Sequence, residues 1–258
     1  MISVDINSDL GESFGAYTIG MDAEVICSVT SVNVACGFHA GDPLVMEKTV
    51  RLAAQSGTEV GAHPGYPDLQ GFGRRSLAMS PDEVRACVMY QVGALQGFLR
   101  AQGMTLQHVK PHGAMYNDAA VSPQIARAIC LGVKAVAPDA VLLGLAGSCL
   151  LDEAQKLGLQ TASEVFADRA YNDDGTLVSR RLPGAVLHDA DTAIARTVRL
   201  VREGVVESVS GRMIPIRADS ICVHGDNPSA LDFVRRIRSS LEAAGVAVRA
   251  MGRKGREA

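Results

Sequence analysis

Histidines, carboxylates and basic side chains gather directly after the short apolar segments of this chain. Five of the six histidines lie at or just past the end of such a segment: His39, His63, His108, His112 and His224. Imidazoles and carboxylates in one place suit general acid–base catalysis or a divalent ion that activates water. Basic side chains there suit a substrate carboxylate or a developing oxyanion. The pattern predicts one site to which several segments contribute, with a buried core position as the alternative for His108.

The candidate residues fall into two groups by their chemistry. The ionisable side chains are the candidate catalytic residues: Asp9, Glu12, His39, His63, Lys110, His112, Glu164 and His224. Polar side chains beside them are the candidate substrate-binding residues: Asn7, Asn33, Tyr66, Arg74, Asn117, Arg169 and Asp226. Asp42 precedes a helix-start sequence and is expected to cap that helix, whereas for Asp226 a cap and a site role are equal alternatives.

The segment from Gly61 to Arg75 is the densest in polar groups. It reads GAHPGYPDLQGFGRR, and its four glycines and two prolines exclude a helix. We expect a shaped loop at a strand end, because such loops often carry binding and catalytic residues. His63 is then the inner group, and Tyr66, Asp68, Arg74 and Arg75 lie at the rim. A plain surface turn is the alternative.

Nucleophilic catalysis has little support in the sequence. The serine-hydrolase motif G-x-S-x-G is absent. Cys36 and His39 could form a thiolate pair, but Cys-Gly is also a common solution for a tight turn. The six cysteines show no C-x-x-C spacing, so we expect reduced thiols rather than disulfides or a zinc knuckle.

Seven strand-like segments, each followed by a helix-like segment, position these residues. The predicted strands span 2–6, 31–35, 59–62, 108–110, 141–146, 161–166 and 220–223. The predicted helices span 21–29, 43–55, 80–101, 122–136, 148–157, 190–203 and 229–244. Because no G-x-G-x-x-G or phosphate-binding loop follows a strand, this alternation favours an α/β barrel over a nucleotide-binding sheet. The C-terminal strand ends of a barrel share one mouth, where active sites lie.

Length and composition set the remaining expectations. The 258 residues, 47% of them hydrophobic, predict a single domain over 1–251 with a hairpin or lid insertion at about 172–187 and a frayed tail at 252–258. A net charge of −3 and 4% aromatic residues argue against a nucleic-acid partner. No run of 18 apolar residues occurs and the chain starts in strand-like sequence, so no membrane span and a cytoplasmic location are expected.

Six segments, in order over nearly the whole chain, resemble the LamB/YcsF family. They are DINSDLGESFG at 5–15, NVACGFHAGDP at 33–43, the 61–75 loop, HVKPHGAMYN at 108–117, EVFADRAY at 164–171 and VHGD at 223–226. One position departs from the family pattern, since Ser8 stands where the family usually has cysteine.

The resemblance implies a seven-stranded β/α barrel of the glycoside hydrolase/deacetylase type. It also implies ATP-dependent opening of the lactam 5-oxo-L-proline to L-glutamate, carried out together with two partner subunits. Because the chain has no common phosphate-binding loop, the handling of ATP is expected to be shared with or delegated to those partners. We expect Arg74 or Lys110 to hold the substrate carboxylate, and an acid or a histidine to act as the base.

A second resemblance is to the YdjC-like metal-dependent deacetylases, in which an acid and two histidines bind a divalent ion. Asp9, His63 and His112 fall in comparable places and form the candidate metal site, and Lys110 stands where that group has an acid. A stand-alone metal-dependent amidase or deacetylase is therefore an alternative function. A non-catalytic scaffold role within a complex is a further alternative, against which the convergence of ionisable groups argues.

Overall fold

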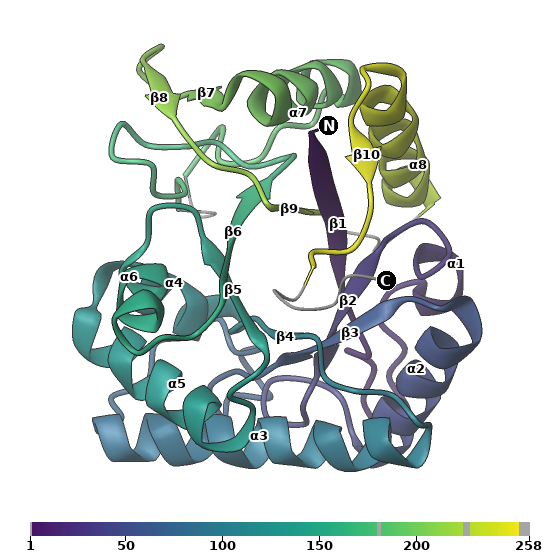
Figure 1. Cartoon of the computed structure of the whole chain (residues 1–258), viewed down its shortest axis with the longest axis vertical. Coiled ribbons are helices and arrows are strands. Elements are labelled where there is room, and N and C mark those ends of the chain that lie inside the picture. The colour runs from purple at the N-terminus through teal and green to yellow at the C-terminus, as the bar shows by residue number, and fades with distance from the viewer. Residues whose placement is uncertain (1, 180–181, 224–227, 253–258) are drawn as a thin grey trace.

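Seven parallel strands close into a barrel in the computed structural model, which describes residues 2–179, 182–223 and 228–252 (Figure 1). The strands are β1 (Ser3–Leu10), β2 (Ser31–Ala35), β3 (Glu59–His63), β4 (His108–Val109), β5 (Val141–Leu145), β6 (Thr161–Phe166) and β9 (Ser220–Cys222). Each pairs with the next, and β9 pairs with both β6 and β1, which closes the ring. The predicted seven-stranded β/α barrel is confirmed.

Helices cover the outside of this barrel (Figure 1). They are α1 (Asp22–Val25), α2 (Pro43–Ser56), α3 (Pro81–Ala101), α4 (Gly113–Val121), α5 (Pro123–Val136), α6 (Cys149–Lys156), α7 (Ala190–Glu203) and α8 (Pro228–Ala243). The Asp42 carboxylate accepts hydrogen bonds from the backbone N–H groups of Leu44 and Val45, which confirms it as the cap of α2. None of the described helices is by itself long and apolar enough to cross a membrane, and α4 and α5 pass that test only as a pair bent by 118°.

Several elements differ from the sequence prediction. Strand β1 continues to Leu10 instead of ending at Ile6, because Asn7 to Leu10 pair with β2. Helix α1 has four residues, and α4 was not expected. An antiparallel pair, β7 (Val205–Glu207) with β8 (Met213–Pro215), and the short β10 (Ala247–Val248) beside the start of β1 add to the predicted strands.

The single-domain boundary at 1–251 stays a prediction. Of the tail predicted at 252–258, only Gly252 belongs to the described residues.

Polar side chains fill the lower part of the barrel interior. Asp5 is 1% exposed, and its carboxylate accepts hydrogen bonds from Thr30 at 2.6 Å, from Ser31 at 2.8 Å and from Ser220. Ser220 belongs to β9 and Ser31 to β2, the two strands that flank β1, and Thr30 directly precedes β2. Burial raises the pKa of Asp5 to about 6, although the hydroxyl donors oppose this shift. The barrel floor therefore holds one acid that loses its proton later than an exposed aspartate does.

The layer above Asp5 depends on a glycine. Asn33 donates to Asn7 Oδ1 at 2.7 Å, and His108 Nε2 lies 2.6 Å from Asn33 Oδ1. A β-carbon at Gly61 would lie 2.1 Å from His108 Nε2, so only glycine on β3 leaves room for this ring. His108 Nδ1 lies 2.8 Å from Gln107 Oε1, so both ring nitrogens have partners. The structure thus places His108 in the core below the mouth. This is the buried core position that the sequence analysis gave as the alternative to a site role.

The variant Asp5→Asn tests the raised pKa of Asp5. The folded protein keeps this proton to higher pH than the unfolded chain, so ionisation of Asp5 lowers the free energy of unfolding as the pH rises from about 4 to about 6. We expect the free energy of unfolding of Asp5→Asn, relative to wild type, to rise by about 1–3 kcal/mol over that interval. Urea unfolding at several pH values measures the difference. Asp139→Asn, at an exposed aspartate, is the control, and a difference that does not grow with pH contradicts the shift.

Candidate active site

A cavity of about 870 Å³ opens at the C-terminal ends of the barrel strands. Eight of the predicted site residues line it: Asp9, Glu12, His63, Arg74, Lys110, His112, Asn117 and Arg169. The segment predicted as an insertion contributes one wall through Asp174, Thr176, Leu177, Val178 and Ser179. Side chains that the sequence scatters over more than 160 positions therefore meet around one space.

The other predicted residues lie around or outside this cavity. His39 and Glu164 are fully buried beside it, and Asn7 and Asn33 belong to the interior layers of the barrel below. Tyr66 is turned away, since its hydroxyl donates to Asp118 Oδ2 at 3.0 Å. His224 and Asp226 lie outside the described residues.

Lys110 is held between two carboxylates from β1 and β6, the two strands that flank β9. Its Nζ lies 3.0 Å from Asp9 Oδ1 on β1 and 2.8 Å from Glu164 Oε1 on β6. It also donates to Asn7 Oδ1 at 3.2 Å and lies 3.3 Å from Cys222 Sγ. Burial alone would lower the pKa of Lys110, but the neighbouring carboxylates outweigh burial and raise it well above its usual range. Since an ammonium has three N–H donors, this charged group is already saturated inside the protein.

Two backbone carbonyls set the tautomers of His63 and His112. His63 Nδ1 lies 2.8 Å from the carbonyl oxygen of Lys110, and His112 Nε2 lies 2.8 Å from that of Phe72. A carbonyl oxygen only accepts, so these nitrogens carry the protons. The lone pairs of His63 Nε2 and His112 Nδ1 then face each other at 3.0 Å. Two neutral imidazoles in these tautomers cannot hydrogen-bond to each other, so the pair is arranged to hold a cation.

Glu12 and His39 complete a cluster with this pair. The rings of His39 and His112 stack with centroids 3.7 Å apart, and neither nitrogen of His39 hydrogen-bonds to any residue that the structure describes. Glu12 Oε1 lies 3.5 Å from His39 Nε2 and 3.7 Å from His112 Nδ1. Burial, followed by the neighbouring histidines, holds the pKa of His39 and of His112 well below the ordinary value. Both rings are thus neutral, the form that binds metal ions.

The cluster fits a divalent metal ion. One ligand atom each from Glu12, His39, His63 and His112 can be chosen so that all four lie within 4.8 Å of one another. Tetrahedral zinc with bonds of about 2.0–2.1 Å places its ligand atoms roughly 3.4 Å apart, close to the separations found here. Three histidines and one carboxylate are also a donor set that suits zinc and similar ions.

The metal site predicted from the sequence overlaps only partly with this cluster. It shares His63 and His112, whereas Asp9 takes a different position. Asp9 Oδ2 approaches His63 Nε2 at 3.3 Å, but Oδ1 accepts from Lys110 and Asn33. Glu12 and His39 stand where the predicted set had Asp9. The role of Asp9 as a ligand stays a prediction.

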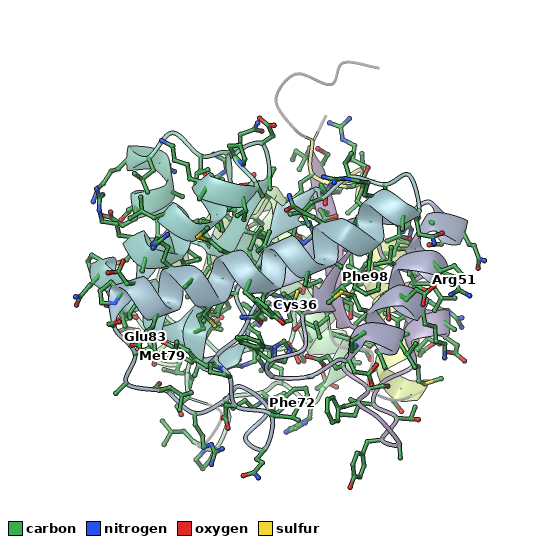
Figure 2. The ribbon with its side chains drawn as sticks, turned by 90° about the horizontal axis from the view of Figure 1, so that it is seen from below. Cys36, Arg51, Phe72, Met79, Glu83 and Phe98 are labelled. Atoms are coloured by element: carbon green, nitrogen blue, oxygen red, sulfur yellow. The ribbon has the colours of Figure 1, made fainter. Side chains whose placement is uncertain are left out.

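The loop Gly61–Arg75 forms one edge of the cluster, and Phe72 lies on it below α3 in Figure 2. Phe72 has a φ of 54°, a left-handed conformation that side chains rarely adopt, and its carbonyl oxygen points at His112. A β-carbon at the next residue, Gly73, would lie 2.7 Å from His39 Cβ and 2.8 Å from His112 Cδ2. The loop therefore needs glycine for close approach and a strained turn to aim one carbonyl.

The basic residues of the rim differ in whether other groups of the protein already bind them. Arg75 is paired with Asp68, and Arg169 donates to the carbonyl oxygens of Val178 at 2.7 Å and Ala185 at 3.4 Å. Arg169 therefore ties the wall segment to the barrel. Arg74 is exposed and lies 5.1 Å from the centroid of the Phe72 ring, with no acidic partner in the described ranges. Arg74 is the cation best placed to meet an incoming anion.

Cys36 is not placed for nucleophilic catalysis. Burial raises the pKa of its thiol to about 12, and the sulfur donates to the carbonyl oxygen of Val34 at 3.1 Å. Thiolate chemistry at Cys36, weighed above, is therefore disfavoured.

The sequence reasoning missed three contributors to the site. They are the carbonyl oxygen of Phe72, the hydroxyl of Tyr116 and the sulfur of Cys222, which lies next to Lys110. Tyr116 follows His112 by four residues, a spacing that places two residues on one face of a helix. That spacing was a usable signal, but it required the helix α4 to be predicted first.

The sequence profile of the LamB/YcsF family matches residues 4–256. The chain belongs to this family. A LamB/YcsF relative from Alkaliphilus metalliredigens, named as the A subunit of 5-oxoprolinase, is 56% identical over 241 residues, which cover 93% of this chain and 94% of the relative. The resemblance seen in the sequence motifs is thereby confirmed.

Solved structures agree with this assignment. The lactam utilization protein from Thermus thermophilus has a TM-score of 0.91 at 48% identity, covering 96% of this chain and 100% of that one. The catalytic domain of a peptidoglycan N-acetylglucosamine deacetylase from Eubacterium rectale has a TM-score of 0.51 at 10% identity, covering 100% and 92%. At such low identity, the second comparison shows only that the LamB/YcsF barrel shares the deacetylase fold.

Removal of single histidines tests the metal cluster. We expect the purified chain to bind about one Zn²⁺ or Co²⁺, and His63→Ala or His112→Ala to weaken binding by at least about 100-fold, because changes behind a metal ligand already cost about 10–100-fold. Equilibrium dialysis with elemental analysis measures this. His188→Ala removes an exposed histidine and is the matched control. Equal binding by wild type and His112→Ala would exclude a metal at this cluster.

Proposed function

We propose that this chain is one of the subunits of an ATP-dependent 5-oxoprolinase, which hydrolyses the lactam of 5-oxo-L-proline to L-glutamate while ATP becomes ADP and phosphate. The observation that carries the proposal is the 56% identity to a relative named as the A subunit of 5-oxoprolinase, over nearly the full length of both chains. The name of the similar Thermus thermophilus protein, lactam utilization protein, points to the same substrate class.

The chemistry of a lactam explains why ATP is needed. A five-membered lactam is a poor electrophile, and transfer of a phosphoryl group to its oxygen makes the ring carbon reactive. Water then adds to that carbon, the ring C–N bond breaks and the nitrogen takes a proton. A second water releases phosphate and leaves the new carboxylate of glutamate.

The cavity supplies groups for substrate binding. Arg74 is proposed to bind the substrate carboxylate, because it is exposed at the cavity rim and lacks an acidic partner in the described part of the chain. Lys110 was the alternative for this role, but its three donors already serve Asp9, Glu164 and Asn7. Lys110 instead places a fixed positive charge at the cavity floor, where it stabilises the negative charge that develops on the oxygen that water adds to the ring carbon.

The remaining groups supply proton transfer and a metal site. Asp9, 19% exposed at its side chain, lies between Lys110 and His63 and is the proposed base that accepts a proton from water. Glu12, His39, His63 and His112 would hold a divalent ion, which when bound supplies Lewis-acid chemistry and an activated water.

ATP and the partner subunits are part of the same proposal. The chain has no phosphate-binding loop of the common types. The proposed nucleotide site therefore lies wholly or partly on two other subunits, in keeping with the word "subunit" in the name of the relative. We propose that this chain holds the lactam or its phosphorylated form.

Single substitutions in the reconstituted complex test the function. We expect Asp9→Ala, His63→Ala, Lys110→Ala and His112→Ala each to lower glutamate formation by at least about 100-fold, the usual effect of losing an acid–base or charge-stabilising group. His188→Ala is the control, and size-exclusion chromatography shows whether each variant still assembles. Near-normal turnover in all four assembled variants contradicts the proposal.

A stand-alone metal-dependent amidase is the second candidate function. The cluster of one glutamate and three histidines within a deacetylase-type barrel favours it. The isolated chain, supplied with Zn²⁺ or Co²⁺ and no ATP, should then hydrolyse simple amides or N-acetyl groups. Activity that requires both ATP and the partner subunits decides for the 5-oxoprolinase.

A further inference from the structure

Tyr116 places a buried hydroxyl at the edge of the cavity. The residue lies on α4, one turn after His112, and is 5% exposed while still lining the cavity. Its hydroxyl faces the Glu164 carboxylate but forms no hydrogen bond of normal geometry with any residue the structure describes. A buried hydroxyl without a partner costs about 1–3 kcal/mol, so its presence beside a reactive site calls for an explanation.

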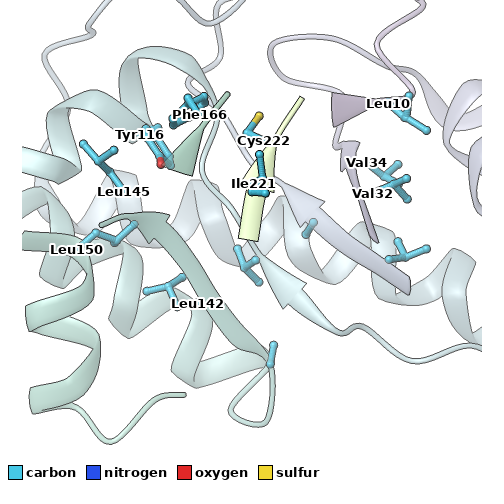
Figure 3. Packing of buried hydrophobic residues seen from close by; sticks show 14 of the residues in the cluster. Leu10, Val32, Val34, Tyr116, Leu142, Leu145, Leu150, Phe166, Ile221 and Cys222 are labelled. Carbon is cyan, nitrogen blue, oxygen red and sulfur yellow. The ribbon is translucent and has the colours of Figure 1, made fainter. Parts of the chain in front are cut away.

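An apolar wall adjoins this hydroxyl. The rings of Tyr116 and Phe166 meet edge to face with centroids 6.1 Å apart, and Leu145 lies on the other side of Tyr116 (Figure 3). Phe166 and Leu145 both line the cavity. Lys110 Nζ lies 5.8 Å from the centroid of the Phe166 ring, so charged and apolar surfaces meet at this point.

This combination matches the two sides of a small lactam. The ring of 5-oxoproline has a hydrocarbon edge of two CH₂ groups and, next to it, a carbonyl oxygen that accepts hydrogen bonds. An apolar wall can contact the CH₂ groups, and a neutral hydrogen-bond donor can bind an oxygen on the lactam carbon. Lys110, Arg75 and Arg169, the buried or paired cations of the cavity, already donate hydrogen bonds to other groups of the protein.

We propose that Tyr116 is a catalytic residue whose hydroxyl donates a hydrogen bond to the oxygen that water adds to the lactam carbon, while the CH₂ edge of the ring packs against Phe166 and Leu145. The inference rests on the function proposed above. The hydrogen bond strengthens as negative charge develops on that oxygen. Burial, followed by the nearby charge of Glu164, raises the pKa of Tyr116 well above its ordinary value, so the hydroxyl keeps its proton at physiological pH.

The variant Tyr116→Phe separates a catalytic from a structural role. In the reconstituted complex, kcat for glutamate formation should fall about 100- to 1000-fold, the effect of losing one oxyanion donor, with little change in KM. The pH–rate profile should keep its shape, because Tyr116 does not titrate in that range. The Tm of the variant should equal or exceed that of wild type, because a buried hydroxyl without a well-formed hydrogen bond is removed.

Tyr90→Phe is the matched control, since Tyr90 is exposed and stacks on Phe38 away from the cavity. Its turnover and Tm should match those of wild type. A Tyr116→Phe complex that turns over at the wild-type rate overturns the inference and leaves the proposed function intact. A fall in kcat that comes with a lowered Tm also overturns it, in favour of a structural role. A wild-type complex that forms no glutamate from 5-oxo-L-proline contradicts the proposed function itself.

Discussion

The positive charge of Lys110 must be neutralised inside the barrel, and the arrangement of the site follows from that requirement. Removing an ammonium from water costs several kcal/mol unless carboxylates surround it with good geometry. Asp9 and Glu164 do so from strands β1 and β6, which fixes both carboxylates. The carbonyl oxygen of Lys110 also accepts a hydrogen bond from His63 Nδ1–H. One residue thereby sets the charge of the cavity floor and the tautomer of a histidine in the adjoining cluster.

Two chemical zones result, and Asp9 stands between them. On one side Lys110 offers a fixed cation, and on the other side the histidines and Glu12 offer lone pairs to a cation. Three carboxyl groups, those of Asp9, Glu12 and Glu164, lie around the single ammonium group of Lys110 and the histidine cluster. A divalent ion in that cluster would add positive charge beside them, in keeping with the ligand geometry. The apolar wall around Phe166 adds a third surface, which suits the hydrocarbon part of a substrate.

The barrel was predictable because each of its β/α units leaves a local record in the sequence, such as the cap of α2 at Asp42. The convergence of Asp9, His63 and Lys110 was predictable because parallel strands end at one mouth. The direction of the Phe72 carbonyl was not predictable from the sequence, because it depends on a strained turn and on the packing of Gly73 against two rings. For the same reason the sequence did not predict that Glu12 and His39 join His63 and His112 in one cluster. Glu12 and His39 were predicted only as catalytic residues, whereas His63 and His112 were also predicted as metal ligands. Ligand atoms meet through tertiary packing, which residue spacing does not encode.

The pairing of β1 with β9 joins the two ends of the chain. Asp5 and its partner Ser220 are 215 positions apart, and the barrel has no closing strand until β9 exists. During synthesis β1 therefore lacks one of its partner strands until almost the whole protein has emerged from the ribosome. Such late, long-range contacts slow folding and leave strand edges open to wrong partners. The inward polar side chains of β1 lower the risk of aggregation during this time, because an exposed strand rich in Asp and Asn aggregates less readily than an apolar one.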